Sequence, residues 1–308
     1  MFRECLEVTE LLSDLSVAGG DVAALFPSGT DLTLTPVASD VGMFDFIRVD
    51  FPGREGKIAR GSAPTVGVLG QLGGLRIPGI PGLASEADGA IVALAVALRM
   101  ARMRESQELF LGDVIVTTHV CQHAVLEPRE PYPFVMPPVP FRRLLDHHID
   151  PAMDAILTVE TARGNRFVCH KGFAITQPAR EGIILPASPD LLRLMEHVTG
   201  EPPVVYPVSM QDITPWDNGV YHSTLLMAPA TVCDVPVVGV GLTSETAPTG
   251  FATNVADSAD QDAAARFCLK VAEQFGVGHC RFHDPDEFDR LSRLYGTPGT
   301  KFHWAPVA

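Results

Sequence analysis

One stretch of the sequence, residues 84–124, constrains the fold more than any other, because a long apolar helix is followed there by a buried strand. Residues 91–103 contain only Ala, Leu, Val, Ile, Met and Arg, and none of these breaks a helix. Residues 113–118 are rich in β-branched side chains, which favour a strand. Open α/β sheets place their chemistry at the ends of such strands, so the polar residues beside these elements are candidates for a site.

The alternation of strand and helix continues along the chain. Apolar runs typical of strands lie at residues 65–70, 154–159, 204–208 and 236–240. A helix begins at Ser188 and ends at Gly200, and another begins near Asp257. Such alternation indicates a layered α/β domain. We therefore predict one α/β domain over residues 1–308.

The charge of the chain limits what it can bind. Its 308 residues carry a net charge of −14, which argues against nucleic acid and anionic membranes as partners. The N-terminus lacks the basic start and apolar run of a signal peptide, and no apolar stretch reaches membrane-spanning length. We expect a cytoplasmic protein that acts on a small-molecule or short-peptide substrate.

Two carboxylates are candidates because of where they fall in the predicted elements. Asp88 lies in the first turn of the apolar helix, where a carboxylate faces unpaired N–H groups. That position alone stabilises a helix by about 0.3–1 kcal/mol, so Asp88 has a purely structural interpretation as well. Glu160 ends an apolar strand, where either an active-site carboxylate or an ordinary solvent-facing residue is expected.

The next strand carries His119, Cys121 and His123, which alternate and would point to one face. Imidazole and thiolate groups at this spacing are suitable zinc ligands. Alternatively, the strand ends near His119, Cys121 is a thiol in the core, and His123 bonds a backbone carbonyl.

Later loops offer candidates for substrate contacts. Asp217 and His222 share a polar loop, and Glu245 follows an apolar strand directly. These residues could equally belong to ordinary turns and to the surface. Residues 127–150 are rich in proline, which is typical of an irregular insertion, here a lid or a subunit contact in a homo-oligomer.

The order of these elements resembles the co-catalytic zinc aminopeptidase superfamily over roughly residues 60–275. The resemblance implies a zinc-exopeptidase-like fold of three layers (α/β/α) with a mixed, mostly parallel central sheet. The segment Ala87-Asp88-Gly89-Ala90-Ile91-Val92-Ala93-Leu94 is similar to the family's helix that begins with a metal-bridging Asp, and Asp88 falls on that Asp. Ile156-Leu157-Thr158-Val159-Glu160-Thr161 is similar to the strand that ends in an acidic ligand, which places Glu160 on the ligand. The resemblance also points to an uncharacterised bacterial family related to these peptidases.

The chain departs from the family's pattern at the other ligand positions. Leu69-Gly70-Gln71-Leu72-Gly73 and Leu242-Thr243-Ser244-Glu245 stand where the family has its two ligand histidines. Thr118-His119-Val120-Cys121 stands where it has a glutamate base and a second glutamate ligand. Either the metal site is rebuilt around Asp88, His119 and Glu160, with or without His123 or Glu245, or the metal has been lost.

The resemblance therefore implies a metal-dependent hydrolase, with zinc or manganese, that cleaves an amide bond in a small peptide or an amino-acid derivative. Asp88, His119, Glu160 and His123 would bind the metal, and His119 and Glu160 would be catalytic. Asp217, His222 and Glu245 would contact substrate. The alternative is a metal-free protein of the same fold that binds a small ligand or acts as a scaffold.

Overall fold

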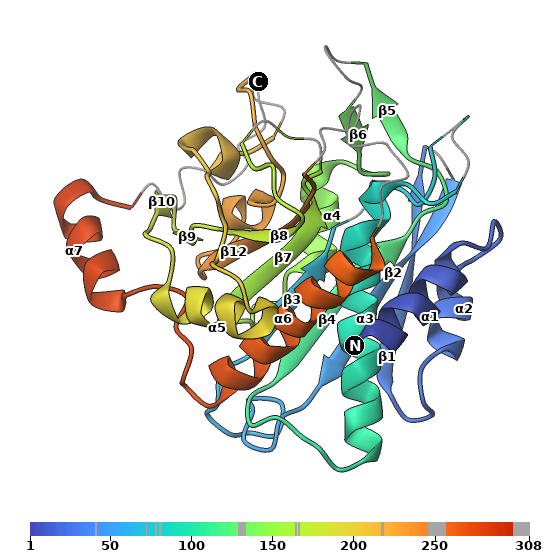
Figure 1. Ribbon diagram of the computed structural model, residues 1–308, viewed down its shortest axis with the longest axis horizontal. Helices are drawn as coiled ribbons and strands as arrows, with labels where there is room; N and C mark the ends of the chain where they lie inside the picture. Colours follow the sequence, from blue (N-terminus) through green and yellow to red (C-terminus); the bar gives the residue numbers. More distant parts are fainter. Residues whose placement is uncertain are drawn as a thin grey trace.

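The computed structural model describes residues 1–40, 42–71, 73–77, 79, 82–128, 134–163, 165, 167–216, 219–245 and 257–297. The main strands are β1 (Asp31–Ser39), β2 (Gly42–Phe51), β3 (Val66–Gly70), β4 (Val114–Val120), β7 (Ala155–Thr161), β8 (Gly172–Thr176), β11 (Val205–Tyr206) and β12 (Val237–Thr243). They form one sheet in the order β1-β2-β4-β3-β7-β12-β8-β11 (Figure 1). The central strands β4, β3, β7 and β12 are parallel, whereas β1, β2 and β8 pair with antiparallel neighbours. The predicted mixed, mostly parallel sheet is confirmed.

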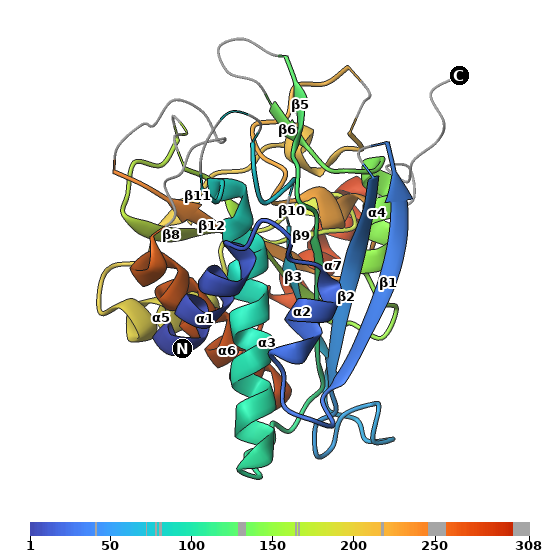
Figure 2. The ribbon, with the colours of Figure 1, turned by 90° about the vertical axis from the view of Figure 1, so that its right-hand side faces the viewer.

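Helices cover both faces of this sheet. One face carries α1 (Phe2–Leu12), α2 (Gly19–Ala24), α3 (Asp88–Glu105), α5 (Pro189–Thr199) and α6 (Ser258–Gly276). The opposite face carries α4 (Phe141–His148) and the 3-10 turns η2 (Met210–Ile213) and η3 (Ala228–Thr231). Figure 2 shows α1, α3 and α6 on one side of the strands and α4 on the other. The three layers expected from the sequence are therefore present.

Helix α3 is the centre of the larger layer. Its side chains from Asp88 to Leu98 are all buried, because α1, α6 and the sheet surround it. A helix that is apolar on all sides needs such a position. Arg102 in its last turn pairs with Glu4 and Glu7 of α1, which fixes the outer end of the helix.

A glycine lets the first turn of α3 approach the strand ends closely. A Cβ added at Gly89 would lie 2.2 Å from the carbonyl oxygen of Gln71 and 2.5 Å from that of Val159. Both are backbone atoms next to the ends of β3 and β7, so they cannot move aside easily. The turn before the helix, η1 (Ser85–Ala87), is thereby held against the end of β7.

The proline-rich insertion contains more regular structure than its composition indicates. Strands β5 (Val125–Glu127) and β6 (Phe134–Met136) form a two-stranded sheet, and α4 follows them. Phe141, Leu144 and Leu145 anchor α4 in the core. Two short strands, β9 (Ala179–Arg180) and β10 (Ile183–Ile184), pair beside β12 near α7 (Pro285–Tyr295). Within the described ranges, no helix is both long and apolar enough to cross a bilayer.

Candidate active site

Two glutamates meet at the carboxyl end of β7. Glu160 is the last residue but one of that strand, and Glu86 lies in the turn η1. Both line one pocket, because the close contact at Gly89 brings η1 to the end of β7. The other lining residues are Val135, Thr161, Ala162, Tyr206, Ser223, Thr224 and Leu225.

The pocket is narrow. It holds about 380 Å³ of empty space including its mouth, but only about 20 Å³ lies far enough from the walls for the centre of a water molecule. Its lining is mixed: two carboxyl groups and several hydroxyl groups stand beside Val135, Ala162 and Leu225. A small polar group of a ligand would therefore meet both glutamates.

Burial raises the pKa of both carboxyl groups above the usual value for a glutamate. It raises the pKa of Glu160 to about 8. It also raises the pKa of Glu86 well above the ordinary value, and the negative charges of Glu160 and Asp88 add to that effect. The Oε2 atom of Glu160 is buried and has no hydrogen-bond partner among the described residues. At neutral pH the two groups together hold at least one proton, so the pair contains an acid next to a potential base.

The hydroxyl groups of the pocket are held in place by its surroundings. Burial, followed by the charges of Asp212 and Glu160, raises the pKa of Tyr206, so its phenol stays neutral. The buried carboxylate of Asp212 accepts hydrogen bonds from the backbone N–H of Ser223 (2.7 Å) and of Thr224 (3.2 Å). It also accepts bonds from the N–H and the hydroxyl of Ser209 (2.8 and 3.0 Å) and from the hydroxyl of Ser223. Asp212 thus fixes the Ser223–Thr224 rim.

Asp88 is buried beside this pair, but its carboxylate is occupied by protein groups. Arg163 donates from Nε to Asp88 (2.9 Å) and from Nη1 to Asp260 (2.9 Å) and to the Thr243 carbonyl (3.0 Å). Gln261 donates from Nε2 to the second oxygen of Asp88 (2.8 Å). The guanidinium of Arg163 therefore supplies the positive charge at the position where the sequence resemblance implies a metal.

His119 lies elsewhere on the sheet. Strand β3 separates β4 from β7, so the backbones of His119 and Glu160 are two strand spacings apart, about 10 Å. The His119 ring contacts Phe44 and Phe46 of β2, with centroids 5.3 and 6.2 Å away, and its ring centroid is 6.3 Å from that of His148. Its ring thus lies toward β2 and α4 rather than toward the glutamate pocket.

The other predicted site residues are also dispersed. His123 is exposed, and its backbone pairs with Arg76. His222 is buried against Trp216, with its ring nitrogens 3.0 Å from the carbonyl oxygens of Val220 and Thr214. Glu245 is exposed after β12, and Asp217 lies outside the described residues. The roles predicted for these residues stay predictions.

Within the described ranges, no group of three or more His, Cys, Asp or Glu side chains could hold a metal ion. Asp88, His119, Glu160 and His123 are accordingly not gathered into one ligand set. Sequence reasoning selected Glu160 from its place at a strand end but passed over Glu86 in favour of Asp88. Two signals were present: Glu86 lies in the same acidic turn, and Arg163 follows the same strand end.

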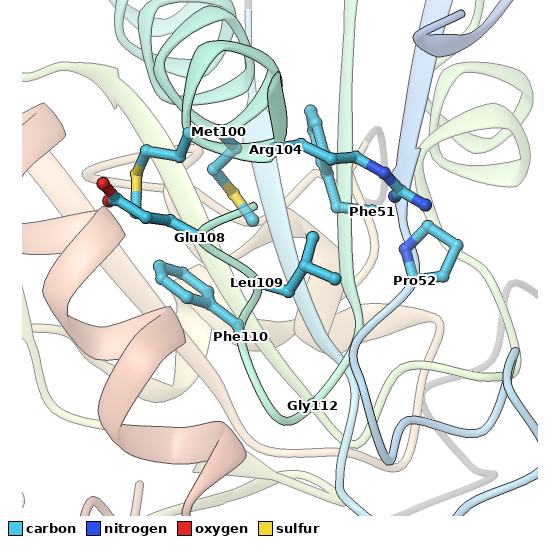
Figure 3. Close-up of a pocket in the computed structure, with 9 residues that line it drawn as sticks. Phe51, Pro52, Met100, Arg104, Glu108, Leu109, Phe110 and Gly112 are labelled. Atoms are coloured by element: carbon cyan, nitrogen blue, oxygen red, sulfur yellow. The ribbon is translucent and has the colours of Figure 1, made fainter. Parts of the chain in front are cut away.

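A second pocket lies at the opposite ends of the parallel strands, beside the end of β2, the start of β4 and the last turns of α3. Figure 3 shows that the charged ends of Arg104 and Glu108 point apart there, on opposite sides of Leu109 and Phe110. Because no polar groups converge, this pocket lacks the arrangement that acid–base chemistry needs. The glutamate pocket remains the candidate active site.

Comparison with known families adds one clear result. A family model described as "Protein of unknown function (DUF1177)" matches residues 35–302. The chain belongs to this family. No curated protein matches the DUF1177 chain.

Two solved structures are similar to this DUF1177 protein. A glutaminyl cyclase from an Acidobacteriales bacterium has 12% sequence identity and a TM-score of 0.49, with 90% of this chain and 94% of the cyclase covered. A variant of tomato leucine aminopeptidase also has 12% identity and a TM-score of 0.49. That alignment covers 87% of this chain and only 60% of the aminopeptidase.

Proposed function

We propose that this protein is a hydrolase that cleaves an amide bond in a small peptide or an amino-acid derivative, with Glu86 and Glu160 as its acid and base. The observation that carries the proposal is the pair of neighbouring carboxyl groups buried in one pocket at the carboxyl end of a central strand. Titratable groups whose surroundings move their pKa values towards neutral pH are typical of acid–base active sites.

The pair supplies both proton transfers that amide hydrolysis needs. The ionised glutamate takes a proton from water while the water oxygen bonds to the carbonyl carbon. The protonated glutamate gives its proton to the nitrogen as the C–N bond breaks, which leaves a carboxylic acid and an amine. Tyr206, Ser223 and Thr224 bring hydroxyl groups to the same pocket, where they could donate to the carbonyl oxygen as negative charge develops on it.

The described residues do not fit the zinc or manganese ion that the sequence resemblance implies. A catalytic zinc site uses three protein ligands, whereas the described lining of this pocket offers two carboxyl groups and no imidazole or thiol. Asp88, the predicted bridging ligand, is hydrogen-bonded to Arg163 and Gln261. We therefore assign the proton transfers to the glutamates, and the proposed mechanism uses no metal ion.

The ion pair between Arg163 and Asp88 supports a second candidate, a metal-free protein that binds a small ligand. In that case the two glutamates would hold a cationic group, such as the ammonium of an amine, without turnover. Binding of amines without cleavage of any amide would distinguish this candidate from the hydrolase.

The test is an assay of amine release from a panel of dipeptides and aminoacyl amides. Glu86→Gln and Glu160→Gln keep the side-chain shape but cannot exchange the proton, so each is expected to lower kcat/KM by about 100-fold or more. Glu196→Gln changes an exposed glutamate on α5 and should leave kcat/KM unchanged.

Turnover at the wild-type rate in both pocket variants would exclude the proposed roles. Metal analysis of protein purified without chelator is the companion measurement. Stoichiometric zinc or manganese that is lost in Glu160→Gln would replace the metal-free mechanism with a metal-dependent one.

A further inference from the structure

A larger cavity lies at the edge of the sheet opposite the glutamates, where β3, β7 and β12 begin. It has a volume of about 430 Å³, and Pro64, Asp154 and Pro236 mark the three strand starts. The end of α6 and the beginning of α7 close it on the other side, next to β9 and β10 (Figure 1). Its size lies within the usual range of small-molecule sites, about 300–1,000 Å³.

The apolar part of the cavity comes from Phe275, Phe282, Val235 and Pro236. Phe282 is almost fully buried, whereas Phe275 is half-buried. Aromatic and proline side chains of this kind offer flat apolar surface to the body of a ligand.

The polar part of the cavity is dominated by two arginines. Arg180 is held in a fixed position, because its guanidinium lies 4.3 Å from the Phe288 ring centroid and its Nε donates to the Asp234 carbonyl (3.3 Å). Among the described residues it forms one ion pair, a long one of 3.6 Å with the adjacent Glu181. Arg281 is exposed, and its guanidinium has no partner among the described residues.

One acidic neighbour, Asp154, does not cancel this positive charge. Asp154 is already neutralised by Lys57, at 2.7 Å, and accepts the backbone N–H of Thr65, at 2.8 Å. His283 Nε2 lies 3.2 Å from Arg180 Nη1. Because a guanidinium only donates, that nitrogen accepts and Nδ1 carries the proton as a further donor. Burial and the charge of Arg180 lower the pKa of His283, which agrees with a neutral ring.

We infer that this cavity binds a small organic monoanion, a carboxylate on an apolar body, with Arg180 and Arg281 holding the carboxylate and Phe275 and Phe282 contacting the body. Guanidinium groups match carboxylates in geometry as well as in charge. The carboxylate of Asp234 at the same cavity disfavours a dianion such as phosphate. This site does not depend on the glutamate pocket, which lies at the other end of β7.

The test is to titrate the full chain with benzoate and with hexanoate and to measure binding by calorimetry or ligand-observed NMR. Both carboxylates are expected to bind saturably at millimolar concentration. Benzamide and hexanamide, which keep the shape and lose the charge, should bind about tenfold more weakly, because a charged hydrogen bond is lost. Inorganic phosphate should also bind more weakly than benzoate.

Variants locate the binding site. Arg281→Gln removes an exposed charge and should lower the affinity for benzoate about tenfold. Arg180→Lys keeps the charge but loses the planar guanidinium group, so it should also lower the affinity for benzoate. Arg193→Gln is the matched control, because Arg193 is exposed, pairs with Asp190 and lies outside the cavity. Glu160→Gln should bind benzoate like the wild type. Equal binding of benzoate and benzamide, no saturation, or equal losses in Arg281→Gln and Arg193→Gln would overturn the inference.

Discussion

Buried carboxyl groups need a partner that compensates their charge, and among the described residues Glu86 and Glu160 have no cation in that role. Arg163 bridges Asp88 and Asp260, so it compensates those two groups. The described residues place no cation beside Glu86 and Glu160, and the only charges that shift the pKa of Glu86 are negative. The glutamate pair lowers that cost by keeping at least one proton, and a retained proton next to a potential base also suits acid–base chemistry.

The retained proton predicts a particular pH dependence of stability. Because the folded-state pKa of Glu160 is about 8 and the unfolded value is near 4.5, the folded chain holds more protons between these values. Its free energy of unfolding should therefore fall as pH rises from about 4.5 to about 8, by up to about 1.4 kcal/mol per pH unit from this group. Glu160→Gln removes the titrating group, so its stability should depend less on pH. Urea unfolding at several pH values measures this, and identical slopes in both proteins would contradict it.

Asp212 gives a second prediction for a single residue. Asp212→Asn loses part of the acceptor capacity that holds Ser209, Ser223 and Thr224, so we expect a loss of about 2 kcal/mol in the free energy of unfolding. Substrate affinity should weaken with it, because the Ser223–Thr224 rim would no longer be fixed. Asp146→Asn is the control: Asp146 is exposed and pairs with Arg142 along α4, so its loss should cost less than about 0.5 kcal/mol. Equal unfolding midpoints in the two variants would rule out this role of Asp212.

The first turn of α3 is the element that creates the candidate site. It brings η1 to the end of β7 only because residue 89 has no side chain. Gly89→Ala should therefore destabilise the fold by about 3 kcal/mol, since the added methyl group would meet backbone oxygens. It should also lower turnover by separating Glu86 from Glu160. Thermal unfolding and the amine-release assay measure the two effects.

A matched glycine separates this steric effect from helix propensity. A Cβ added at Gly20 in α2 would meet nothing within 4 Å. Gly20→Ala should therefore leave stability unchanged or raise it by about 0.5–1 kcal/mol. If Gly89→Ala behaved like Gly20→Ala, the close contact would not be what holds η1 in place.

For the whole molecule, the sequence was sufficient to predict the layers and most strands. Periodicity and helix caps are local signals, so α3, α5, α6 and the central strands could be read directly from residues such as Ser188 and Gly200. Helix α4 was missed, because the prolines around it suggested an irregular insertion. Homo-oligomer formation stays a prediction, which a measurement of molar mass by light scattering would test.

The candidate site was harder to predict than the fold, because it depends on which residues meet in space. Glu160 was found from its place at a strand end. The pairing of Arg163 with Asp88 joins residues 75 positions apart, and no spacing rule reveals it. His119 ends a strand just as Glu160 does, but the sheet order puts β3 between them. A local pattern therefore correctly indicated the carboxyl ends of the strands as the place of the site. It did not indicate which side chains converge there.

The charge imbalance among the buried acids has a consequence for refolding. The glutamate pair gives up at least one proton in the unfolded chain at pH 7 and recovers it when the pocket forms. The chain must therefore draw hydrogen ions from the solvent as it folds. Denaturant dilution into a nearly unbuffered solution should turn an indicator dye towards its alkaline colour, and the change should be smaller when position 160 is glutamine.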